Sequence, residues 1–338
     1  MNKNIKIIAE IGPNHNGSIK TAVKLLNQLS KIGVKIVKFQ LANPYKVYSN
    51  QSIKASYQKK NTGEGSIIEM SKKIQLKRSE HLLLSKECKK LNITYSCSAF
   101  DLDSLKFLNE KIDVPFFKIP SGEILSIDML NYIALQNKPI VLSTGMATLS
   151  EIDFALNILN KKNKKNITLM HCISSYPASP KNANMNFIET LKLKYKLNIG
   201  FSDHTLGHEC ALIAISKGAN IIEKHVTLNK NSIGPDHKTS LNVNQFKNFI
   251  NKINNTQKSL GSKNRYFTKK ELEIKSVARK SIVANKNLAK GYKIKLKDVS
   301  FKRPGIGITP DKIKYLLNKK LNKNIKKNNL ILISDIID

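Results

Sequence analysis

The stretches "GFSDHTLG" (residues 200–207) and "IIEKHVTL" (residues 221–228) each lead from a short apolar run to a histidine. His204 and His225 therefore lie at the ends of two successive strand-like segments, with charged or hydroxyl residues beside them. Between them, "CALIAISKGAN" (residues 210–220) has a helical pattern that ends at Gly218, a residue typical of helix ends. A strand, a helix and a second strand form the repeating unit of a parallel sheet. This unit recurs along most of the chain.

Eight short apolar runs alternate with longer helical patterns, such as residues 19–33 and 148–160. Eight strand–helix units in about 230 residues predict an α/β fold of the (β/α)8 type, a TIM barrel. The alternative is a doubly wound open sheet, which usually has fewer strands and binds its ligand at one switch point. The runs are "IKIIAE" (5–10), "VKIVKFQ" (34–40), "ITYSCS" (93–98), "PFFKIPSGE" (115–123), "PIVLSTG" (139–145), "ITLMHC" (167–172), "LNIGFSDH" (197–204) and "NIIEKHV" (220–226).

Nearly every run finishes in a polar or ionisable residue. In a barrel, the carboxyl ends of the strands converge on one face, where the active site lies. Strand periodicity adds that Lys38 and Gln40 share a face, as do Glu223 and His225. The sequence therefore predicts a ring of polar side chains at that face. Its members by strand end are Glu10, Gln40, Ser98, Lys118, Ser143, His171, Ser202 and His225.

The composition of this ring suggests a ligand. Lysines with clustered hydroxyls suit a phosphate or a carboxylate. Two neutral imidazoles on adjacent strands suit one divalent metal with open positions, which polarises a carbonyl as a Lewis acid. The alternative, that one of the histidines is a buried hydrogen-bonding residue, stays open. The lysines and serines concerned are Lys38, Lys118, Lys224, Ser121, Ser143 and Ser202.

Composition restricts the class of protein. The 338 residues are 41% hydrophobic, which is typical of a globular protein with a large core. No apolar run approaches the roughly 18 residues of a membrane span, and Glu10 lies where a signal peptide needs its apolar centre. We therefore expect a cytoplasmic protein without a membrane partner. The four cysteines are scattered, with no spacing typical of a disulfide framework.

The net charge of +34 raises the alternative of a basic nucleic-acid-binding protein. Only four of the 58 basic residues are arginines, however, although base readout and phosphate forks favour arginine. The lysines alternate with Asn and Ile. This pattern is expected where the proteome as a whole prefers lysine at solvent-exposed positions. A nucleic-acid-binding function would also leave the polar ring unexplained, so we expect no nucleic-acid partner.

Taken together, the motifs closely resemble the bacterial sialic acid synthase family, which includes synthases of N-acetylneuraminic, legionaminic and pseudaminic acids. The segments "ARKSIVANKNLAKG" (278–291) and "FKRPGIGI" (301–308) are similar to the small antifreeze-like (SAF) domain of that family. With these segments, the chain divides into a TIM barrel over residues 1–265, a linker over 266–280 and a small, mostly β domain over 281–338. The motifs are "AEIGPNHNG" (9–17), "VKFQ" (37–40), "YQKKNTGEGS" (57–66), "KIPSGE" (118–123), "LSTGMAT" (142–148), "HCISSYP" (171–177), "GFSDHTLG", "IEKHVTL" and "GPDHKTSL" (234–241).

The resemblance implies that phosphoenolpyruvate condenses with an N-acylated mannosamine-type sugar, yielding a nine-carbon 2-keto sugar acid and phosphate. It also implies a divalent metal, typically manganese, and a homodimer in which the small domain covers the partner's barrel. The alternative enzyme is another phosphoenolpyruvate-dependent, aldose-condensing synthase of the same barrel type. The motif "EIGPNHNG" fits the neuraminic and legionaminic branches better than the pseudaminic branch.

The resemblance also implies roles for single residues. His204 and His225 correspond to metal ligands, and Glu10 and its rival Glu123 to the proton acceptor. The sugar-binding positions are Gln40, Tyr176, Asp236 and, across the dimer, Arg303. The phosphoenolpyruvate-binding positions are Lys38, Ser98, Lys118, Ser121, Ser143, Ser174 and Ser202.

Overall fold

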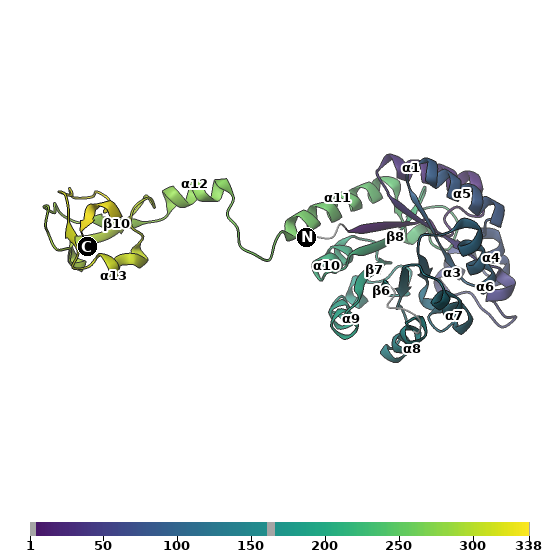
Figure 1. The fold of residues 1–338 in the computed structure, drawn as a ribbon. Coiled ribbons are helices and arrows are strands. Elements are labelled where there is room, and N and C mark those ends of the chain that lie inside the picture. Colours follow the sequence, from purple (N-terminus) through teal and green to yellow (C-terminus); the bar gives the residue numbers. More distant parts are fainter. Residues whose placement is uncertain (1–4, 161–165, 338) are drawn as a thin grey trace. The chain divides into compact units, whose positions relative to one another are not determined.

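The computed structural model describes residues 5–160 and 166–337. The chain divides into two compact units, Met1–Gly261 and Ser262–Asp338 (Figure 1). The first unit contains the strands and helices of a barrel, and the second is a small unit with its own core. None of the helices in the described ranges is long and apolar enough to cross a membrane.

The first unit is a closed barrel. In the described part of the chain, β1 to β8 pair in sequence order and in parallel, and β1 also pairs with β8. This closure excludes the doubly wound open sheet and confirms the predicted TIM barrel. A short strand, β9 (Leu241–Asn242), extends β8. The barrel strands are β1 (Lys6–Glu10), β2 (Ile36–Leu41), β3 (Thr94–Ala99), β4 (Phe117–Ile119), β5 (Ile140–Ser143), β6 (Ile167–Cys172), β7 (Asn198–Asp203) and β8 (Ile221–Thr227).

Helices follow the strands and pack around the barrel (Figure 1). Their ends have local causes: Ser18 caps α1 by accepting a hydrogen bond from the Thr21 amide, and Thr148 caps α8 in the same way. The α-helices are α1 (Ile19–Lys31), α2 (Pro44–Val47), α3 (Ser56–Thr62), α4 (Ile67–Ile74), α5 (Arg78–Lys90), α6 (Leu102–Phe107), α7 (Ile127–Leu135), α8 (Leu149–Leu159), α9 (Phe187–Tyr195), α10 (Glu209–Ser216) and α11 (Val243–Leu260). Shorter turns of helix are η1 (Leu108–Ile112), η2 (Ser121–Glu123), η3 (Pro180–Asn182) and η4 (His237–Thr239).

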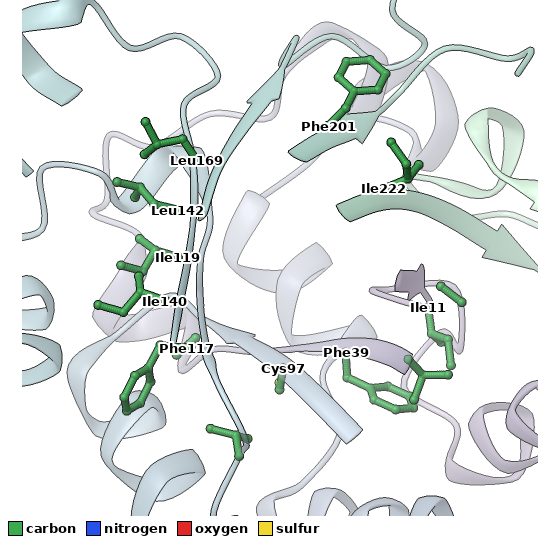
Figure 2. Close-up of a cluster of buried hydrophobic side chains, with 14 of the residues drawn as sticks. Ile11, Phe39, Cys97, Phe117, Ile119, Ile140, Leu142, Leu169, Phe201 and Ile222 are labelled. Carbon is green, nitrogen blue, oxygen red and sulfur yellow. The ribbon is translucent and has the colours of Figure 1, made fainter. Parts of the chain in front are cut away.

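Each barrel strand has two buried faces. One face packs outward against the helices, as the buried side chains of Phe39, Cys97, Leu142, Phe201 and Ile222 show in Figure 2. Since successive strand residues point to opposite sides, the residue after each of these points into the barrel. Those inward residues are Gln40, Ser98, Ser143, Ser202 and Glu223.

The barrel interior has an apolar layer and a polar layer. Ile8, Val141, Met170 and Ile221 form a separate buried apolar cluster. Two residues further along the same strands and on the same face lie Glu10, Ser143, Cys172 and Glu223. The apolar layer thus closes the barrel beneath the polar ring, which lies toward the carboxyl ends of the strands.

The second unit contains short strands around a small core. β10 (Ser281–Ala284) pairs antiparallel with β11 (Val299–Lys302), and β12 (Lys320–Leu321) with β13 (Ile336–Ile337). Its other elements are η5 (Leu296–Asp298), η6 (Pro310–Lys312), α13 (Ile313–Leu316) and η7 (Ile333–Asp335). Residues 266–280, predicted as a linker, contain a helix, α12 (Lys269–Ala278), which has no buried residue.

Candidate active site

Four buried charged side chains meet inside the barrel. Lys38 Nζ lies 3.0 Å from Glu10 Oε2 and 3.5 Å from Glu223 Oε1, and Lys118 Nζ lies 3.8 Å from the same Glu223 oxygen. All four residues are at most 5% exposed. Burial of single charges would be costly, and pairing offsets that cost. This network, at the carboxyl ends of the strands, is therefore a candidate site for a polar ligand.

Serine hydroxyls complete this network. Lys38 Nζ donates to Ser98 Oγ at 3.2 Å, Lys118 Nζ donates to Ser143 Oγ at 2.7 Å, and Ser202 Oγ donates to Glu223 Oε1 at 3.0 Å. The strand register brings them together, because Ser98 is paired with Lys118 and Ser202 with Glu223. Five residues predicted to bind phosphoenolpyruvate are thus neighbours here: Lys38, Ser98, Lys118, Ser143 and Ser202.

A second pair of hydroxyls lies at the rim. The Oγ atoms of Ser121 and Ser174 are 3.2 Å apart, on the loops after β4 and β6. Gly145 lies between these loops without space for a side chain, since a Cβ there would be 2.5 Å from Ser174 Oγ and 2.7 Å from Cys172 Sγ. Ser121 and Ser174, both predicted to bind phosphoenolpyruvate, therefore lie next to each other beside Gly145.

The pKa values of the two carboxyl groups in the network, Glu10 and Glu223, shift in opposite directions. Burial raises the pKa of Glu10 to about 7, with the ion pair to Lys38 opposing this shift. Burial also opposes ionisation of Glu223, but Lys118 and Lys38 outweigh it and lower the pKa of Glu223 to about 2. At neutral pH, Glu223 is therefore ionised, whereas Glu10 exchanges a proton readily.

The pKa values of Lys38 and Lys118 also shift in opposite directions. Burial acts to lower the pKa of Lys38, but its contacts with Glu10 and Glu223 raise that pKa above the usual value. Burial lowers the pKa of Lys118, and Glu223 only partly offsets the effect. A bound anion would stabilise the Lys118 ammonium further.

His204 and His225 lie side by side at the ends of β7 and β8, with ring centroids 5.5 Å apart. His204 Nδ1 donates to the Ile173 carbonyl at 2.7 Å, which leaves Nε2 unprotonated in the neutral ring. Burial lowers the pKa of both histidines, and for His225 the neighbouring His204 adds to the shift. Both imidazoles are therefore neutral at neutral pH, as metal ligation requires.

The donor set fits a divalent metal with few protein ligands. His225 Nδ1 is buried without a hydrogen-bond partner among the described residues, and it lies 3.5 Å from Asp236 Oδ2. Within residues 5–160 and 166–337, no three or more His, Cys, Asp or Glu residues group in a way that could hold a metal. Any metal here would take its remaining ligands from substrate or water.

An aromatic wall borders the histidines. The Tyr176 ring lies 4.2 Å from the His204 ring and stacks on Tyr57 of α3 at 5.0 Å, measured between centroids. Asp236 is buried beside His225, and burial raises its pKa to about 7. Gln40 Nε2 donates to Glu10 Oε1 at 2.7 Å. Three predicted sugar-binding residues, Gln40, Tyr176 and Asp236, thus border the network or the histidines, and Arg303 belongs to the second unit.

Glu123 has different surroundings from Glu10. It is half-buried in η2, accepts a hydrogen bond from Ser126 Oγ, and has a pKa raised by burial. It lines a pocket of about 510 Å³ with Lys46, Asp101 and Asp103. Neither Lys38 nor Glu223 contacts Glu123 through an ion pair or hydrogen bond in the described ranges.

Two residues were assigned to the ring from their position near strand ends, but their side chains point out of the barrel, so that prediction was wrong. His171 Nε2 hydrogen-bonds the Ala183 carbonyl, and its ring stacks on the outward-facing Phe201. Lys224 Nζ lies 2.8 Å from Asp203 Oδ2 and donates to backbone carbonyls of the loop that follows β7. The residues directly adjacent to them, Cys172 and Glu223, point inward instead.

Sequence reasoning gave no role to two residues that the structure places in the site. Glu223 is the shared partner of Lys38, Lys118 and Ser202. Its two-residue spacing from His225 already indicated an inward position. Tyr57 stacks on Tyr176, and neither spacing nor periodicity pointed to that contact.

Comparisons with known proteins agree along the chain. The NeuB family model matches residues 7–265 and the SAF domain model matches residues 279–337. The chain is 41% identical to the N,N'-diacetyllegionaminic acid synthase of Campylobacter jejuni, across 97% of this chain and 99% of that protein. It is 35% identical to the Legionella pneumophila protein of the same name, across 96% and 93%. The crystal structure of an N-acetylneuraminic acid synthetase from Leptospira borgpetersenii superposes with a TM-score of 0.72 at 33% identity, covering 80% of this chain and 90% of that one.

Proposed function

This chain belongs to the NeuB family and has a SAF domain at its C-terminal end, and we propose that it condenses phosphoenolpyruvate with an N-acylated mannosamine-type sugar. The products are a nine-carbon 2-keto sugar acid and phosphate. The observation that supports this reaction most directly is the buried network of Lys38, Lys118 and Glu223 with its serine hydroxyls, next to a pair of neutral histidines. Ammonium and hydroxyl donors in a buried pocket suit a phosphorylated carboxylate.

For the sugar, we propose a 2,4-diacetamido-6-deoxy substrate of the mannosamine type. The relatives from Campylobacter jejuni and Legionella pneumophila, which support this choice, are both named N,N'-diacetyllegionaminic acid synthase. The test is phosphate release from phosphoenolpyruvate with this sugar or with N-acetylmannosamine. We expect kcat/KM to be at least about tenfold higher with the diacetamido sugar. An enzyme that binds the second acetamido group would leave its polar partners unpaired with a sugar that lacks this group, which is costly. Failure of both sugars to stimulate phosphate release would overturn the proposal.

The anion would bind through the donors that the strands present. Lys118 and Ser143 are already hydrogen-bonded to each other and can both donate to a phosphate group. Ser121 and Ser174 add two hydroxyls beside Gly145. Glu223 contacts both Lys38 and Lys118, and its negative charge favours the charged form of each. As phosphate leaves, the same donors stabilise its negative charge.

Proton transfer would fall to Glu10. C3 of phosphoenolpyruvate forms a bond to the aldehyde carbon of the open-chain sugar. The aldehyde π bond breaks, its oxygen takes up a proton to become a hydroxyl, and C2 becomes electron-deficient. Water then adds to C2, and the resulting intermediate breaks its C2–O bond to release phosphate. Glu10 is buried in the network and has a pKa of about 7, which suits a group that accepts the proton of this water. Glu223 stays ionised because of its two lysine partners.

We propose that His204 and His225 hold a divalent metal, with manganese expected, which when bound supplies Lewis-acid polarisation of the sugar carbonyl. The Ile173 carbonyl fixes the tautomer of His204, and such a partner typically orients a ligating imidazole. Burial keeps both rings neutral. The Tyr176 ring packs against the His204 ring and helps to hold it in place.

The proton acceptor can be identified from the pH dependence. A carboxyl group with a pKa of about 7 is protonated below that pH and ionised above it, so kcat/KM should rise through pH 7. The Glu10→Gln enzyme should lose about 100-fold in kcat, together with this rising limb, because it has no proton acceptor. The measurement is kcat/KM between pH 5.5 and about 8.5, a range that brackets the titration.

The rival carboxylates supply the controls for this experiment. Glu123→Gln should keep the rising limb if Glu10 is the acceptor. Asp236, whose pKa is also raised to about 7, is tested by Asp236→Asn, which should likewise keep the limb. A limb that persists in Glu10→Gln and disappears in Glu123→Gln would assign the role to Glu123.

We also propose a homodimer in which Arg303 of one subunit serves the barrel of its partner. In support, Arg303 is an exposed residue of the second unit, and it forms no ion pair or side-chain hydrogen bond with any described residue. It is also one of only four arginines in a chain that otherwise uses lysine. A planar guanidinium is difficult to replace at a polar contact, which is a reason to keep it.

Subunit mixing tests this arrangement. Arg303→Ala and His225→Ala proteins, each inactive alone, should form heterodimers with one intact site and recover about a quarter of wild-type activity after random exchange. Arg279→Ala is the matched control and should be active without mixing. If a two-tag pull-down demonstrates exchange and no activity returns, Arg303 does not act across the dimer.

A further inference from the structure

The barrel has a cavity at the end opposite the candidate active site. Its volume is about 780 Å³, within the range typical of small-molecule sites. Residues at the amino ends of the eight barrel strands line it, and we call it the amino-terminal mouth. Its lining residues are Lys6, Ile8, Lys35, Ile36, Thr94, Pro115, Phe116, Pro139, Ile140, Val141, Asn166, Thr168, Asn198, Asn220 and Ile221.

The floor of the amino-terminal mouth is the apolar layer that closes the barrel. Ile8, Val141 and Ile221 are buried there, and Ile36 and Phe116 are partly exposed to the cavity. The catalytic network begins two residues further along the same strands, roughly 7 Å away at the rise of a β-strand. A ligand in the mouth would therefore lie apart from a ligand in the active site.

One side of the rim is polar and cationic. Asn220 Nδ2 donates to Asn198 Oδ1 at 3.2 Å, and Asn198 Nδ2 donates to Asn166 Oδ1 at 3.3 Å, so that amides connect the starts of β8, β7 and β6. Lys6 and Lys35 continue the arc on β1 and β2. Both lysines are exposed, and neither has an ion pair with any residue in the described ranges.

The other side of the rim is apolar. Pro115 and Phe116 precede β4, and Pro139 precedes β5, so that flat apolar surfaces face the mouth from these neighbouring strands. None of the described residues that line the cavity carries a carboxylate. The rim thus combines two free cations and an amide row on one side with an aromatic and proline wall on the other.

We propose that the amino-terminal mouth is a second binding site, for a small anion with a flat apolar body. The apolar body would lie on Phe116 and the prolines, and the anionic group would lie between Lys6 and Lys35. Burial of the apolar body supplies the affinity, and the two cations select for negative charge.

A pair of fluorescent probes tests this site on the full-length protein. 8-Anilinonaphthalene-1-sulfonate has a flat apolar body with one negative charge, and N-phenyl-1-naphthylamine has a similar body without the charge. We expect saturable binding of the sulfonate, at least about fivefold tighter than the neutral probe, as charge-assisted contacts add to apolar burial. Saturating phosphoenolpyruvate should not displace it. Displacement would place the probe in the active site and overturn the proposal.

Variants locate the probe. Lys6→Met with Lys35→Met should weaken sulfonate binding about tenfold and leave the neutral probe almost unchanged. Lys20→Met with Lys24→Met, which removes the same charge from the exposed face of α1, should change neither. Ile36→Trp fills the cavity and should abolish binding of both probes while phosphate release continues. If the Lys6 and Lys35 variant binds the sulfonate as wild type does, the site is not in the mouth, whether or not Ile36→Trp folds.

Discussion

The His204→Ala and His225→Ala enzymes should each release phosphate more than about 100-fold more slowly than wild type, since even loss of a second-shell partner typically costs about 10- to 100-fold. The physical reason is the small number of donors. Two buried, neutral imidazoles are the donors that the barrel offers, and no larger cluster of metal-binding side chains was found among the described residues. Removal of either would leave a metal with a single protein ligand.

Three measurements would separate ligation from folding. Bound manganese, measured by equilibrium dialysis, should fall in both variants, and thermal unfolding should remain cooperative. His208→Ala is the matched control, because His208 lies on the same loop as His204 and contacts Lys252 instead of the site. Chelator should abolish wild-type activity, and manganese should restore it. Full activity of a metal-free His204→Ala protein would contradict the assignment.

The Lys118→Met enzyme should have a KM for phosphoenolpyruvate on the order of 100-fold higher, equivalent to about 2.7 kcal/mol, with a much smaller effect on the KM for the sugar. Methionine retains the length and apolar stem of the side chain while removing the ammonium group that donates to Ser143. Glu223 keeps Lys38 and Ser202 as partners, so the substitution does not leave it unpaired. We therefore expect a binding defect in a folded protein.

Initial rates with each substrate varied in turn would test this expectation. Lys106→Met, on the exposed surface of α6, removes the same charge far from the network and should have wild-type constants. Equal increases in both KM values, or a large loss of thermal stability, would mean that Lys118 supports the fold and does not bind the anion specifically.

The sequence was sufficient for the architecture because the barrel repeats one local pattern. Short apolar runs, helix caps such as Ser18 and Thr148, and Gly218 after α10 are local signals, and the structure has an element at each. Strand periodicity also placed Lys38 with Gln40, and Glu223 with His225, on shared faces. Those pairs lie inside the barrel, where Lys38 and Glu223 form an ion pair.

The sequence alone did not show, for every strand, which residues point into the barrel. β6 is buried on every residue, so its pattern does not alternate and its phase is not visible. The pairing of Cys172 with Ser202 and of His171 with Phe201 decides that phase, and it turns His171 toward α9. In β8 the same logic turns Lys224 outward to Asp203.

Residue patterns alone predicted the eight strand–helix units, the small second unit and most of the polar residues at the carboxyl ends of the strands, because these depend on local patterns that repeat. Only the tertiary structure made Glu223 the common partner of two lysines, since that contact joins strands far apart in the chain. It also separated Glu10 from Glu123, which look alike as strand-end carboxylates. Burial raises the pKa of Glu10 to about 7 although the ion pair with Lys38 opposes this shift, and such surroundings exist only once the barrel has closed.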